Sequence, residues 1–598
     1  MKRNRFKPLP KPKEPKKASS RRKRPAKPAR SRTRPGLSLP RPSRQDLIHL
    51  ALLLVLCAVF FYSFLGYRGL YETDEARYAE IAREMLVSGD FITPHLNYVK
   101  YFEKPPLTYW LVALSFKLFG LSEASARLVP AVFGTLTVLL TFLLGRSLWG
   151  SRQGFFAAST LATSAMFFGL SRILIVDMVL CFGVTLALYG AWQTLRQKAA
   201  GPYFFWIGCA VGFLSKALLG PGLPIMAVVL FGLLSGRHDL WRRLLYWPAL
   251  VVFVLLSAPW VIWVSIKNPE FFNFFFIDEN LGRLLTKRHH RYEPFYYYLQ
   301  VLPGAIFPWV ALLPWSLGES WPGRAWRREE NQPWLFVMVW LVSFFLFFSA
   351  SSSKMMHYIL PLLPAACLIL GNSLARLGQG GWRSPSPAGV RASLTGLALL
   401  SLAAGVAVLV VPALNPDIGF DRLGLALLLI PLATAGLGLL FFYLRGRTWA
   451  ALAAPATAFL VMVLGAGVVA PHLEAYRSLK GLVEAARAEM TPRDLLVSYG
   501  DYYQGIPFYS RRRVAVVRNW GELDFGRRQA GPRARSWFIP DDDAFLQLLL
   551  SPRHRVLAFA KTRHFHEFQK WARGTPGLLL FEWARLGDKS LFSNRPRR

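Results

Sequence analysis

Long apolar segments recur along this 598-residue chain from residue 47 to residue 470. Most are close to the length of about 20 residues that an α-helix needs to cross a bilayer, and they contain few charges. Only 18% of the residues are charged, whereas 53% are hydrophobic. The pattern predicts a polytopic α-helical membrane protein.

The apolar segments predict about thirteen membrane-spanning helices. A further apolar segment, residues 106–119, is short for a span and contains Tyr109, Trp110 and Lys117. We therefore expect it to lie in the membrane interface. The predicted spans are 47–66, 126–148, 152–171, 174–195, 203–216, 220–235, 244–266, 297–317, 333–350, 356–376, 393–412, 422–444 and 449–470.

The basic residues between the spans set the orientation. Every loop that this count places in the cytoplasm carries Arg or Lys, as the positive-inside rule requires. Counting residues 106–119 as a full span would invert all later loops and break this agreement. Residues 67–125 and 267–296 are then external loops within a transmembrane domain of residues 46–470. The odd number of spans places residues 471–598 outside the cytoplasm.

The N-terminal segment is a separate region. Residues 1–45 hold 18 Lys and Arg against one Glu, which leaves +17 of the chain's net +38 in this tail. The tail is Pro-rich and has no apolar periodicity, so we expect it to be disordered. A cytoplasmic tail of this kind sets topology and contacts anionic lipid head groups. Contact with RNA or the ribosome is the less favoured alternative, and no nucleic-acid partner is predicted.

The C-terminal region, residues 471–598, has the composition of a soluble α/β domain. It contains no GxGxxG motif and no P-loop, so we assign it no nucleotide. The four cysteines of the chain all lie in apolar spans and are expected to be buried small hydrophobic residues. The predicted strands are 494–499, 514–517, 555–560 and 578–583, and the predicted helices are 473–490, 542–550 and 564–573.

A charged stretch, residues 71–86, directly follows the first span. Thr73 or Asp74 can cap the start of a helix there, and Ser88-Gly89 can end it. Asp74, Arg77 and Tyr78 then share one helix face. An acid, a base and a phenol at a membrane surface suggest chemistry on a polar head group. The alternative is a solvated amphipathic helix at the interface.

Further ionisable residues gather at the predicted outer ends of the spans. Such groups are costly at membrane depth and are usually functional. A mixture of acids and bases suits a site that holds an anionic phosphate and keeps a carboxylate for acid–base chemistry. These outer residues include Tyr101, Glu103, Lys104, Arg172, Asp177, Lys216, Asp278, Glu279, Arg283, His289, His290, Lys354, His357 and Tyr358.

Several members of this group also have a simpler structural explanation. The gathering of so many ionisable residues on one side of the membrane is harder to explain by structural roles than any single residue is. The alternatives are helix capping by Glu103 and Lys104, a mutual ion pair of Arg172 and Asp177, solvation instead of metal binding at His289 and His290, and membrane anchoring by Lys354.

The motifs together resemble a known family. They are Tyr-Glu-x-Asp-Glu-Ala-Arg-Tyr-Ala from Tyr71, Tyr-Phe-Glu-Lys-Pro-Pro-Leu from Tyr101, the Arg172 and Asp177 pair, residues 291–298, Tyr358-Ile-Leu-Pro, and residues 502–509. Over residues 45–510 the chain resembles bacterial C-type (GT-C) glycosyltransferases. Within that class it resembles the 4-amino-4-deoxy-L-arabinose lipid A transferases, which are related to protein O-mannosyltransferases.

The resemblance implies a polyprenyl-phosphate-linked sugar as donor, used at the outer side of the inner membrane. It implies lipid A, another glycan or a protein hydroxyl as acceptor. It also implies that Asp74 lies at the reaction centre and that Asp177 is the second acid. The residues matching the lining of the donor pocket are Arg77, Tyr78, Tyr101, Glu103, Lys104 and Tyr358.

One departure from the family pattern concerns metal binding. The family often has Glu-His-x-x-Arg where this chain has Glu279-Asn-Leu-Gly-Arg283. A metal site that uses this His is not supported, and no cofactor is predicted. Lys104 and Arg283, with Arg77 or Lys216, would then stabilise the leaving phosphate.

The role of Asp74 depends on the acceptor. Asp74 is the candidate general base in an inverting displacement if the acceptor is a hydroxyl. If the acceptor is a phosphate, Asp74 would position the acceptor or pair with an amino sugar. The chain is thus predicted to be a membrane glycosyltransferase that uses a polyprenyl-phosphate sugar. The alternatives are a transporter or flippase of lipid-linked sugars, and a membrane anchor that displays a binding domain.

Overall fold

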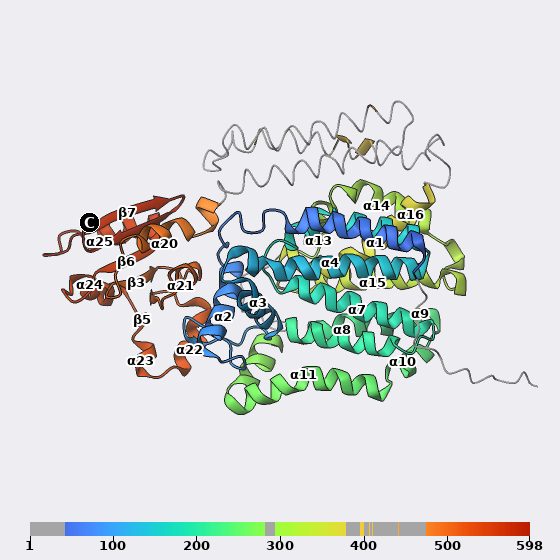
Figure 1. The fold of residues 1–598 in the computed structure, drawn as a ribbon, viewed down its shortest axis with the longest axis horizontal. Coiled ribbons are helices and arrows are strands. Elements are labelled where there is room, and N and C mark those ends of the chain that lie inside the picture. Colours follow the sequence, from blue (N-terminus) through green and yellow to red (C-terminus); the bar gives the residue numbers. More distant parts are fainter. Residues whose placement is uncertain are drawn as a thin grey trace, which may run out of the picture.

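The computed structural model describes residues 42–281, 293–377 and 474–597, with isolated positions between 395 and 441. The basic tail up to residue 41, Arg283 and nearly all of the last three predicted spans lie outside these residues. Within them, a bundle of long helices adjoins an α/β domain, and α2 and α3 lie where the two meet (Figure 1).

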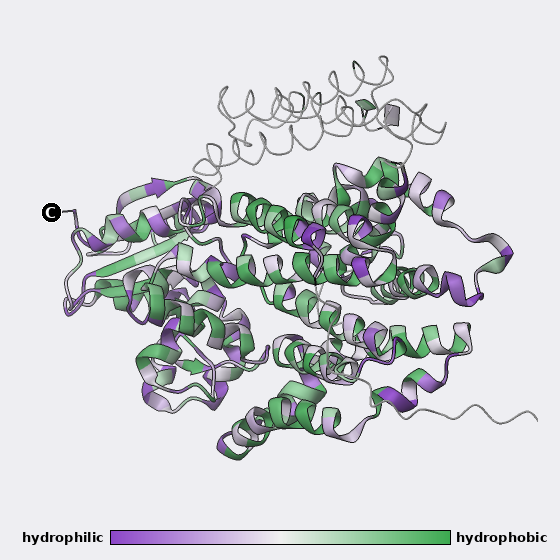
Figure 2. Ribbon diagram, turned by 45° about the vertical axis from the view of Figure 1, so that its right-hand side comes forward, coloured by the Kyte–Doolittle hydropathy of each residue, from purple (hydrophilic) through white to green (hydrophobic). Residues whose placement is uncertain are grey.

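The bundle is built of helices that run roughly along one direction (Figure 1). α7 and the η6–α16 segment are its most enclosed elements, whereas α11 is largely exposed on the surface. Green, hydrophobic ribbon dominates these helices in Figure 2. The elements are α1 (Arg44–Cys57), η1 (Ala58–Tyr62), α4 (Glu123–Leu148), α5 (Ser151–Ala162), α6 (Ala165–Leu170), α7 (Asp177–Leu195), α8 (Gly201–Lys216), α9 (Leu219–Ser235), α10 (Asp239–Leu244), α11 (Trp247–Lys267), η2 (Asn273–Leu281), α13 (Tyr297–Ile306), η3 (Trp309–Leu312), α14 (Leu313–Ser320), η4 (Gly323–Ala325), η5 (Glu329–Asn331), α15 (Gln332–Ala350), η6 (Met356–Leu362) and α16 (Leu363–Leu377).

Each predicted span that falls within the described residues corresponds to a helix or a pair of helices. Six described helical segments are long and apolar enough to cross a membrane, and a seventh is obtained if the bent pair 297–306 and 309–320 counts as one span. That pair bends by 108°. The predicted span 152–171 is divided into α5 and α6. The class of polytopic membrane protein is confirmed, whereas the count of thirteen stays a prediction.

The C-terminal domain contains a six-stranded mixed sheet in the order β5-β4-β3-β6-β8-β7. The first four strands of this order are parallel, and β8 pairs antiparallel with β6 and β7. The four predicted strands occur, although β7 begins later than expected. The elements are α20 (Lys480–Arg487), β3 (Leu495–Tyr499), α21 (Gly505–Ser510), β4 (Ala515–Val517), η8 (Gly521–Leu523), α22 (Asp524–Gln529), α23 (Pro532–Arg535), β5 (Phe538–Ile539), α24 (Asp542–Leu550), β6 (Val556–Lys561), α25 (Thr562–Trp571), β7 (Phe581–Leu586) and β8 (Lys589–Ser593).

Between the bundle and this domain lie α2 (Asp74–Ser88), a short hairpin of β1 (His95–Leu96) and β2 (Val99–Lys100), and α3 (Leu107–Phe119). α2 has the predicted bounds, and it ends because Gly89 adopts a left-handed conformation, with φ of 72°, that glycine tolerates without strain. α3 is the predicted short helix, and its interfacial location stays a prediction. Ten of the fifteen residues of α2 are buried, including three glutamates. This burial contradicts the alternative of a solvated amphipathic helix.

A buried ion pair fixes α2 to the bundle. Glu75 on α2 and Arg127 on α4 are each 1% exposed, and the two Arg127–Glu75 N–O distances are 2.8 and 3.0 Å. Arg127 also donates to the carbonyl oxygens of residues 65, 68 and 69, each at 2.8 Å. Arg68 contacts the same carboxylate at 2.6 Å. Burial opposes ionisation of Glu75, but the charges of Arg127 and Arg68 outweigh it and lower the pKa of Glu75 to about 2.

We expect Arg127→Leu to destabilise the folded protein by about 3–5 kcal/mol, because it leaves the Glu75 carboxylate buried without its main partner. The measurement is thermal unfolding of the purified protein in detergent. Lys480→Leu is the matched control, since it also breaks an ion pair with α4, to Glu123 at 2.9 Å, but at a partly exposed position. Its expected loss is about 1 kcal/mol or less. Equal losses for the two variants would contradict the account.

Candidate active site

The first of two charged clusters lies where α7 begins and α8 ends. Asp177 begins α7, and Lys216 ends the antiparallel α8, so their side chains meet with Nζ 2.6 Å from the carboxylate. The Nε2 atom of His357 lies 3.6 Å from the other oxygen of Asp177. Lys216 Nζ also lies 4.2 Å from the ring centre of Tyr358. Asp177 therefore lies between the side chains of Lys216 and His357.

Glycine allows α7 and α8 to approach closely enough for this contact. A Cβ atom on Gly208 of α8 would lie 2.4 Å from the backbone nitrogen of Ala187 on α7. A Cβ atom on Gly183 would lie 2.8 Å from the carbonyl oxygen of Gly208. Both distances are too short for a side chain, so the register that joins Asp177 to Lys216 depends on small residues.

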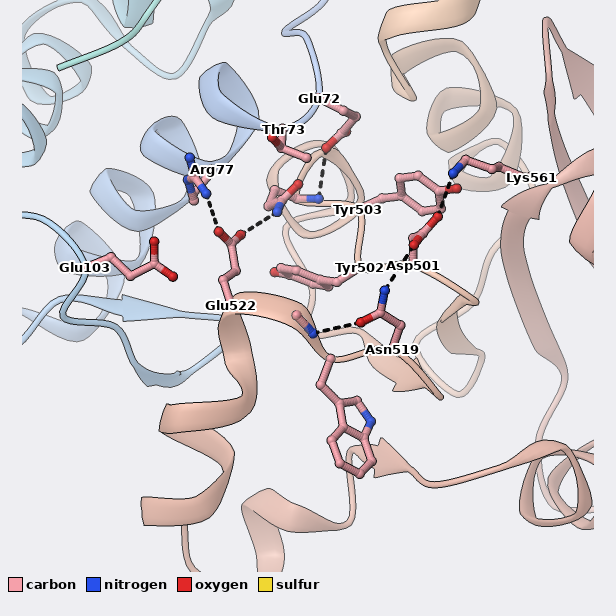
Figure 3. A pocket seen from close by; sticks show the side chains of 13 residues that line it. Glu72, Thr73, Arg77, Glu103, Asp501, Tyr502, Tyr503, Asn519, Glu522 and Lys561 are labelled. Carbon is pink, nitrogen blue, oxygen red and sulfur yellow. Dashed lines mark hydrogen bonds and ion pairs between the residues drawn. The ribbon is translucent and has the colours of Figure 1, made fainter. Parts of the chain in front are cut away.

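The second cluster crosses from α2 to the C-terminal domain. The guanidinium group of Arg77 pairs with Asp74, one turn earlier on α2, and with Glu522 of the C-terminal domain. Glu522 also accepts a hydrogen bond from the side-chain amide of Gln504. Figure 3 shows Arg77 and Glu522 pointing toward one another across the domain boundary. This cluster therefore has four members. Asp74 and Arg77 come from α2, and Glu522 and Gln504 come from the C-terminal domain.

Tyr78 lies between the two clusters. Burial raises the pKa of the Tyr78 phenol above its usual range; the Arg77 charge opposes this shift, and the charges of Asp74 and Asp177 add to it. Its ring centre is 5.8 Å from that of Tyr109 on α3. Tyr78 therefore remains a neutral hydrogen-bond donor close to both acids.

The loop before α3 adds a cation and an acid to this region. Lys104 Nζ donates to the carbonyl oxygen of Glu103 at 3.0 Å and lies 3.8 Å from Glu279 Oε1. Glu103 lines the cavity described next. Arg283, which was predicted to bind the donor phosphate, lies outside the described residues, so its place near Lys104 stays a prediction.

A cavity of about 620 Å³ lies between α2 and the loops of the C-terminal domain. It has four carboxylates in its wall and only two cations, Arg77 and Lys561 (Figure 3). The wall is therefore acidic. The lining residues are Glu72, Thr73, Arg77, Glu103, Asp501, Tyr502, Tyr503, Gln504, Asn519, Trp520, Gly521, Glu522 and Lys561.

Several buried polar atoms of this wall have no hydrogen-bond partner among the described residues. They are the hydroxyls of Tyr502 and Tyr503, the Oε1 atom of Gln504, the Nε atom of Arg77 and the indole nitrogen of Trp520. Buried polar groups nearly always have a partner. A ligand that carries both donors and acceptors, such as a sugar, would supply these partners.

Glu72 connects the backbone of the two domains at the edge of the cavity. Its two carboxylate oxygens accept hydrogen bonds from the backbone nitrogens of Gly505, at 2.9 Å, and Gln504, at 3.0 Å. Burial raises the pKa of Glu72 to about 8, and these two hydrogen bonds only partly oppose the shift. Glu72 therefore changes charge near neutral pH.

The raised pKa predicts a pH-dependent stability. The folded protein keeps a proton on Glu72 that the unfolded chain loses near pH 4.5, the ordinary pKa of a glutamate. The stabilisation is complete below that pH, falls as the pH rises through about 8, and is constant above. We expect the melting temperature of the wild type, relative to Glu72→Gln, to fall between about pH 4.5 and 8 and then to level off. A difference that is independent of pH would contradict the assignment.

The sequence-predicted residues are brought together in large part. Asp74, Arg77 and Tyr78 lie with the second cluster, and Asp177 and Tyr358 lie in the first. The Tyr101 hydroxyl is buried without a partner among the described residues, and burial raises the pKa of this phenol. The proposed mutual pairing of Arg172 and Asp177 is wrong, because Arg172 donates to the carbonyl of Ser63 at 2.5 Å while Asp177 pairs with Lys216.

The alternative role of Lys354 as a membrane anchor does not agree with its contacts. Lys354 is buried and donates to the carbonyl oxygens of Ser351 and Glu293, at 2.6 and 2.9 Å. Lys354 is therefore held by the protein backbone and does not extend to solvent as an anchor.

The described residues contain no group of three or more His, Cys, Asp or Glu side chains able to hold a metal ion. His289 and His290 lie outside the described residues.

Sequence analysis missed the contribution of the C-terminal domain. Glu522, Asp501 and Lys561 line the cavity, but they are spread over some 60 residues of a domain without a recognised motif. Glu72 was part of the quoted motif but was not singled out. The run 502–509, which was quoted for the family resemblance, is the signal that could have placed this domain at the site.

Comparison with known proteins agrees with this architecture. Residues 103–263 match the model of the dolichyl-phosphate-mannose-protein mannosyltransferase family, and residues 482–585 match the aminoarabinose transferase C-terminal domain. A mannosyltransferase segment within the bundle, followed by a transferase domain at the cavity, defines the protein as a membrane glycosyltransferase.

Curated relatives identify the family. The chain is 30% identical over 525 residues to the undecaprenyl phosphate-α-4-amino-4-deoxy-L-arabinose arabinosyl transferase of Pectobacterium atrosepticum, which covers 84% of this chain and 90% of the relative. It is 34% identical over 365 residues to the enzyme of that name from Pseudomonas aeruginosa, covering 59% and 64% of the two chains. The protein belongs to this family of arabinosyl transferases.

Solved structures agree with the family assignment. The crystal structure of ArnT from Cupriavidus metallidurans bound to undecaprenyl phosphate superimposes with a TM-score of 0.79 at 27% sequence identity. The match covers 92% of this chain and 99% of that one. The structure of the same protein in the apo state gives a TM-score of 0.77. The similarity thus extends over both the bundle and the C-terminal domain.

Proposed function

We propose that this protein transfers 4-amino-4-deoxy-L-arabinose from undecaprenyl phosphate to lipid A at the outer side of the bacterial inner membrane. The observation that carries the proposal is the acidic cavity beside a cluster of Lys, His and Asp side chains at one end of the bundle. The acidic wall suits an amino sugar, and the neighbouring cations suit a phosphate. The names of the curated relatives support the choice of donor.

The cationic side of the site would hold the donor phosphate. Lys216 and His357 flank Asp177, and Lys104 extends from the loop before α3. When the bond between the sugar C1 atom and the phosphate oxygen breaks, the electron pair stays on the lipid phosphate, which leaves with increased negative charge. Fixed cations at that position stabilise the transition state. Asp177 would keep Lys216 and His357 in place, and Arg283 remains a predicted further cation.

The acidic side would receive the sugar. Glu103, Asp501 and Glu522 line the cavity with Glu72, whose carboxyl is mostly protonated at neutral pH. A protonated amine on the sugar would be attracted to the ionised carboxylates. The unpartnered hydroxyl of Tyr502 would bind a sugar oxygen. This arrangement would favour an amino sugar over a neutral pentose or hexose.

Asp74 would lie where the acceptor attacks. It is about one-third exposed and pairs with Arg77. With a phosphate acceptor little base catalysis is needed, and Asp74 would then position the acceptor through Arg77. With a hydroxyl acceptor Asp74 would be the general base of a single inverting displacement.

The proposed orientation follows the basic loops. The N-terminus would lie in the cytoplasm, and the C-terminal domain, with the cavity beneath it, would lie in the periplasm. The transporter alternative is not favoured, because the relatives are named transferases and the ionisable groups gather at one end of the bundle. A transporter would move the lipid-linked sugar without breaking the sugar–phosphate bond.

We expect Asp177→Asn and Lys216→Met each to lower the transfer rate by about 10²–10³-fold. Lys216→Met removes a cation from the site of the leaving phosphate, and Asp177→Asn removes the carboxylate that keeps Lys216 and His357 in place. Mass spectrometry would follow conversion of undecaprenyl phosphate-aminoarabinose to undecaprenyl phosphate and the mass gained by lipid A. Lys267→Met is the matched control, since Lys267 pairs with Asp90 at the same end of the bundle but at a half-exposed position.

The control should retain the wild-type rate. Transport without loss of donor by the wild type would overturn the proposed transfer. A wild type that consumes the donor but leaves lipid A unmodified would instead contradict only the acceptor. Equal rates for Lys216→Met and Lys267→Met would show that Lys216 is not part of the phosphate site.

A further inference from the structure

A second cavity, of about 610 Å³, lies at the end of the bundle opposite to the active site. α7 and α8 meet at Asp177 and Lys216 at one end, so the turn that joins them, residues 196–200, lies at the other. The length of α7 separates the two ends by about 28 Å. The lining residues are Thr194, Gln197, Lys198, Ala199, Pro202, Tyr203, Arg243 and Tyr246.

The cavity combines an aromatic wall with cations. The rings of Tyr203 and Tyr246 meet edge to face, with 6.0 Å between their centres. Lys198 is half-buried in the turn, whereas Arg243 is exposed at the end of α10. Arg243 has one acidic partner, Asp239, at 3.1 Å, and Asp239 is shared with Arg237.

The surroundings mark this end as a membrane boundary with excess positive charge. Tyr246 and Trp247 begin the apolar helix α11 and are 46% and 70% exposed, as is typical of the aromatic residues that lie at the level of lipid head groups. Arg196 and Arg242 are exposed beside the cavity. With Lys198, Arg237 and Arg243, the basic residues at this end outnumber the nearby acidic residues. Glu329, a further acid at this end, lies 3.6 Å from Arg237.

We propose that this cavity binds the head group of an anionic phospholipid of the cytoplasmic leaflet. Basic pockets between membrane helices on that side are suited to anionic head groups. Lys198 and Arg243 would contact the phosphodiester, and the two tyrosines would cover the glycerol region. The N-terminal tail of the same chain is not a suitable occupant, because its positive charge would be repelled by Lys198 and Arg243. The assignment to the cytoplasmic leaflet rests on the orientation given under the proposed function. The binding of an anionic head group in this cavity does not depend on that orientation.

Such a lipid would join the α7–α8 turn to the beginning of α11. α7 and α8 carry Asp177 and Lys216 at their far ends, and Trp206 of α8 already donates to the carbonyl of Leu244, at 2.7 Å, beside the cavity. Occupancy would therefore stabilise the same pair of helices that holds the first charged cluster.

Two variants of the full-length protein test the site. Lys198→Gln combined with Arg243→Gln removes both lining cations, and Ala199→Trp fills the cavity without changing its charge. Arg324→Gln combined with Arg328→Gln is the matched control, because it removes the same charge from exposed positions near Glu329 outside the cavity. The probe is phosphatidylglycerol added to protein in a neutral detergent, with bound lipid counted by native mass spectrometry.

We expect the double cavity variant to lower the affinity for phosphatidylglycerol about tenfold or more, since each basic residue at a membrane surface contributes substantially to binding. Ala199→Trp should lower it similarly, and the control pair should not. Phosphatidylcholine and inorganic phosphate should bind weakly to the wild type.

Equal losses in the cavity and control pairs would overturn the proposal in favour of general surface charge. Unchanged binding in Ala199→Trp, or equal binding of phosphatidylcholine, would also overturn it. The assay contains no sugar donor, so failure of the proposed transfer would not change its result. Melting temperatures of all variants without lipid identify any variant that fails to fold.

Discussion

The buried pair of Glu75 and Arg127 is the interaction on which the arrangement of the site depends. It fixes the first turn of α2 to α4 at the end of the bundle, and five hydrogen bonds from Arg127 satisfy its guanidinium group almost completely. An ion pair this deeply buried is stable only when its remaining polar atoms have partners. The rigid first turn then determines where Asp74 and Arg77, on the neighbouring positions, can point.

α2 consequently acts as the bridge between two regions of opposite charge. Toward the bundle it approaches Asp177 and Lys216, and toward the C-terminal domain Arg77 reaches Glu522 and the acidic cavity. A donor with a phosphate and an amino sugar has the same division of charge. In the proposed function the bundle holds the lipid phosphate and the C-terminal domain recognises the sugar. The two matched family segments lie in the same two parts of the chain.

The sequence predicted those features that depend on local pattern. Apolar length located the helices of the bundle, Gly89 located the end of α2, and the helical spacing brought Asp74 next to Arg77. Spacing alone could not reveal that Lys216 and not Arg172 pairs with Asp177, because this choice depends on the close packing of α7 against α8. Glu522 was missed for a related reason: its contact with Arg77 joins positions 445 residues apart. Strand β8, whose five residues are all buried and include two serines and a lysine, carries no alternating pattern that would predict it.

The central claim is that α2 and the C-terminal domain form one site through Arg77 and Glu522. A double-mutant cycle with Arg77→Gln and Glu522→Gln, read as the rate of sugar transfer, tests this claim most directly. The account predicts that each single variant lowers the rate and that the double variant is no slower than the slower single one. Losses that multiply in the double variant would show that the two residues act independently, and would contradict a site shared between the domains.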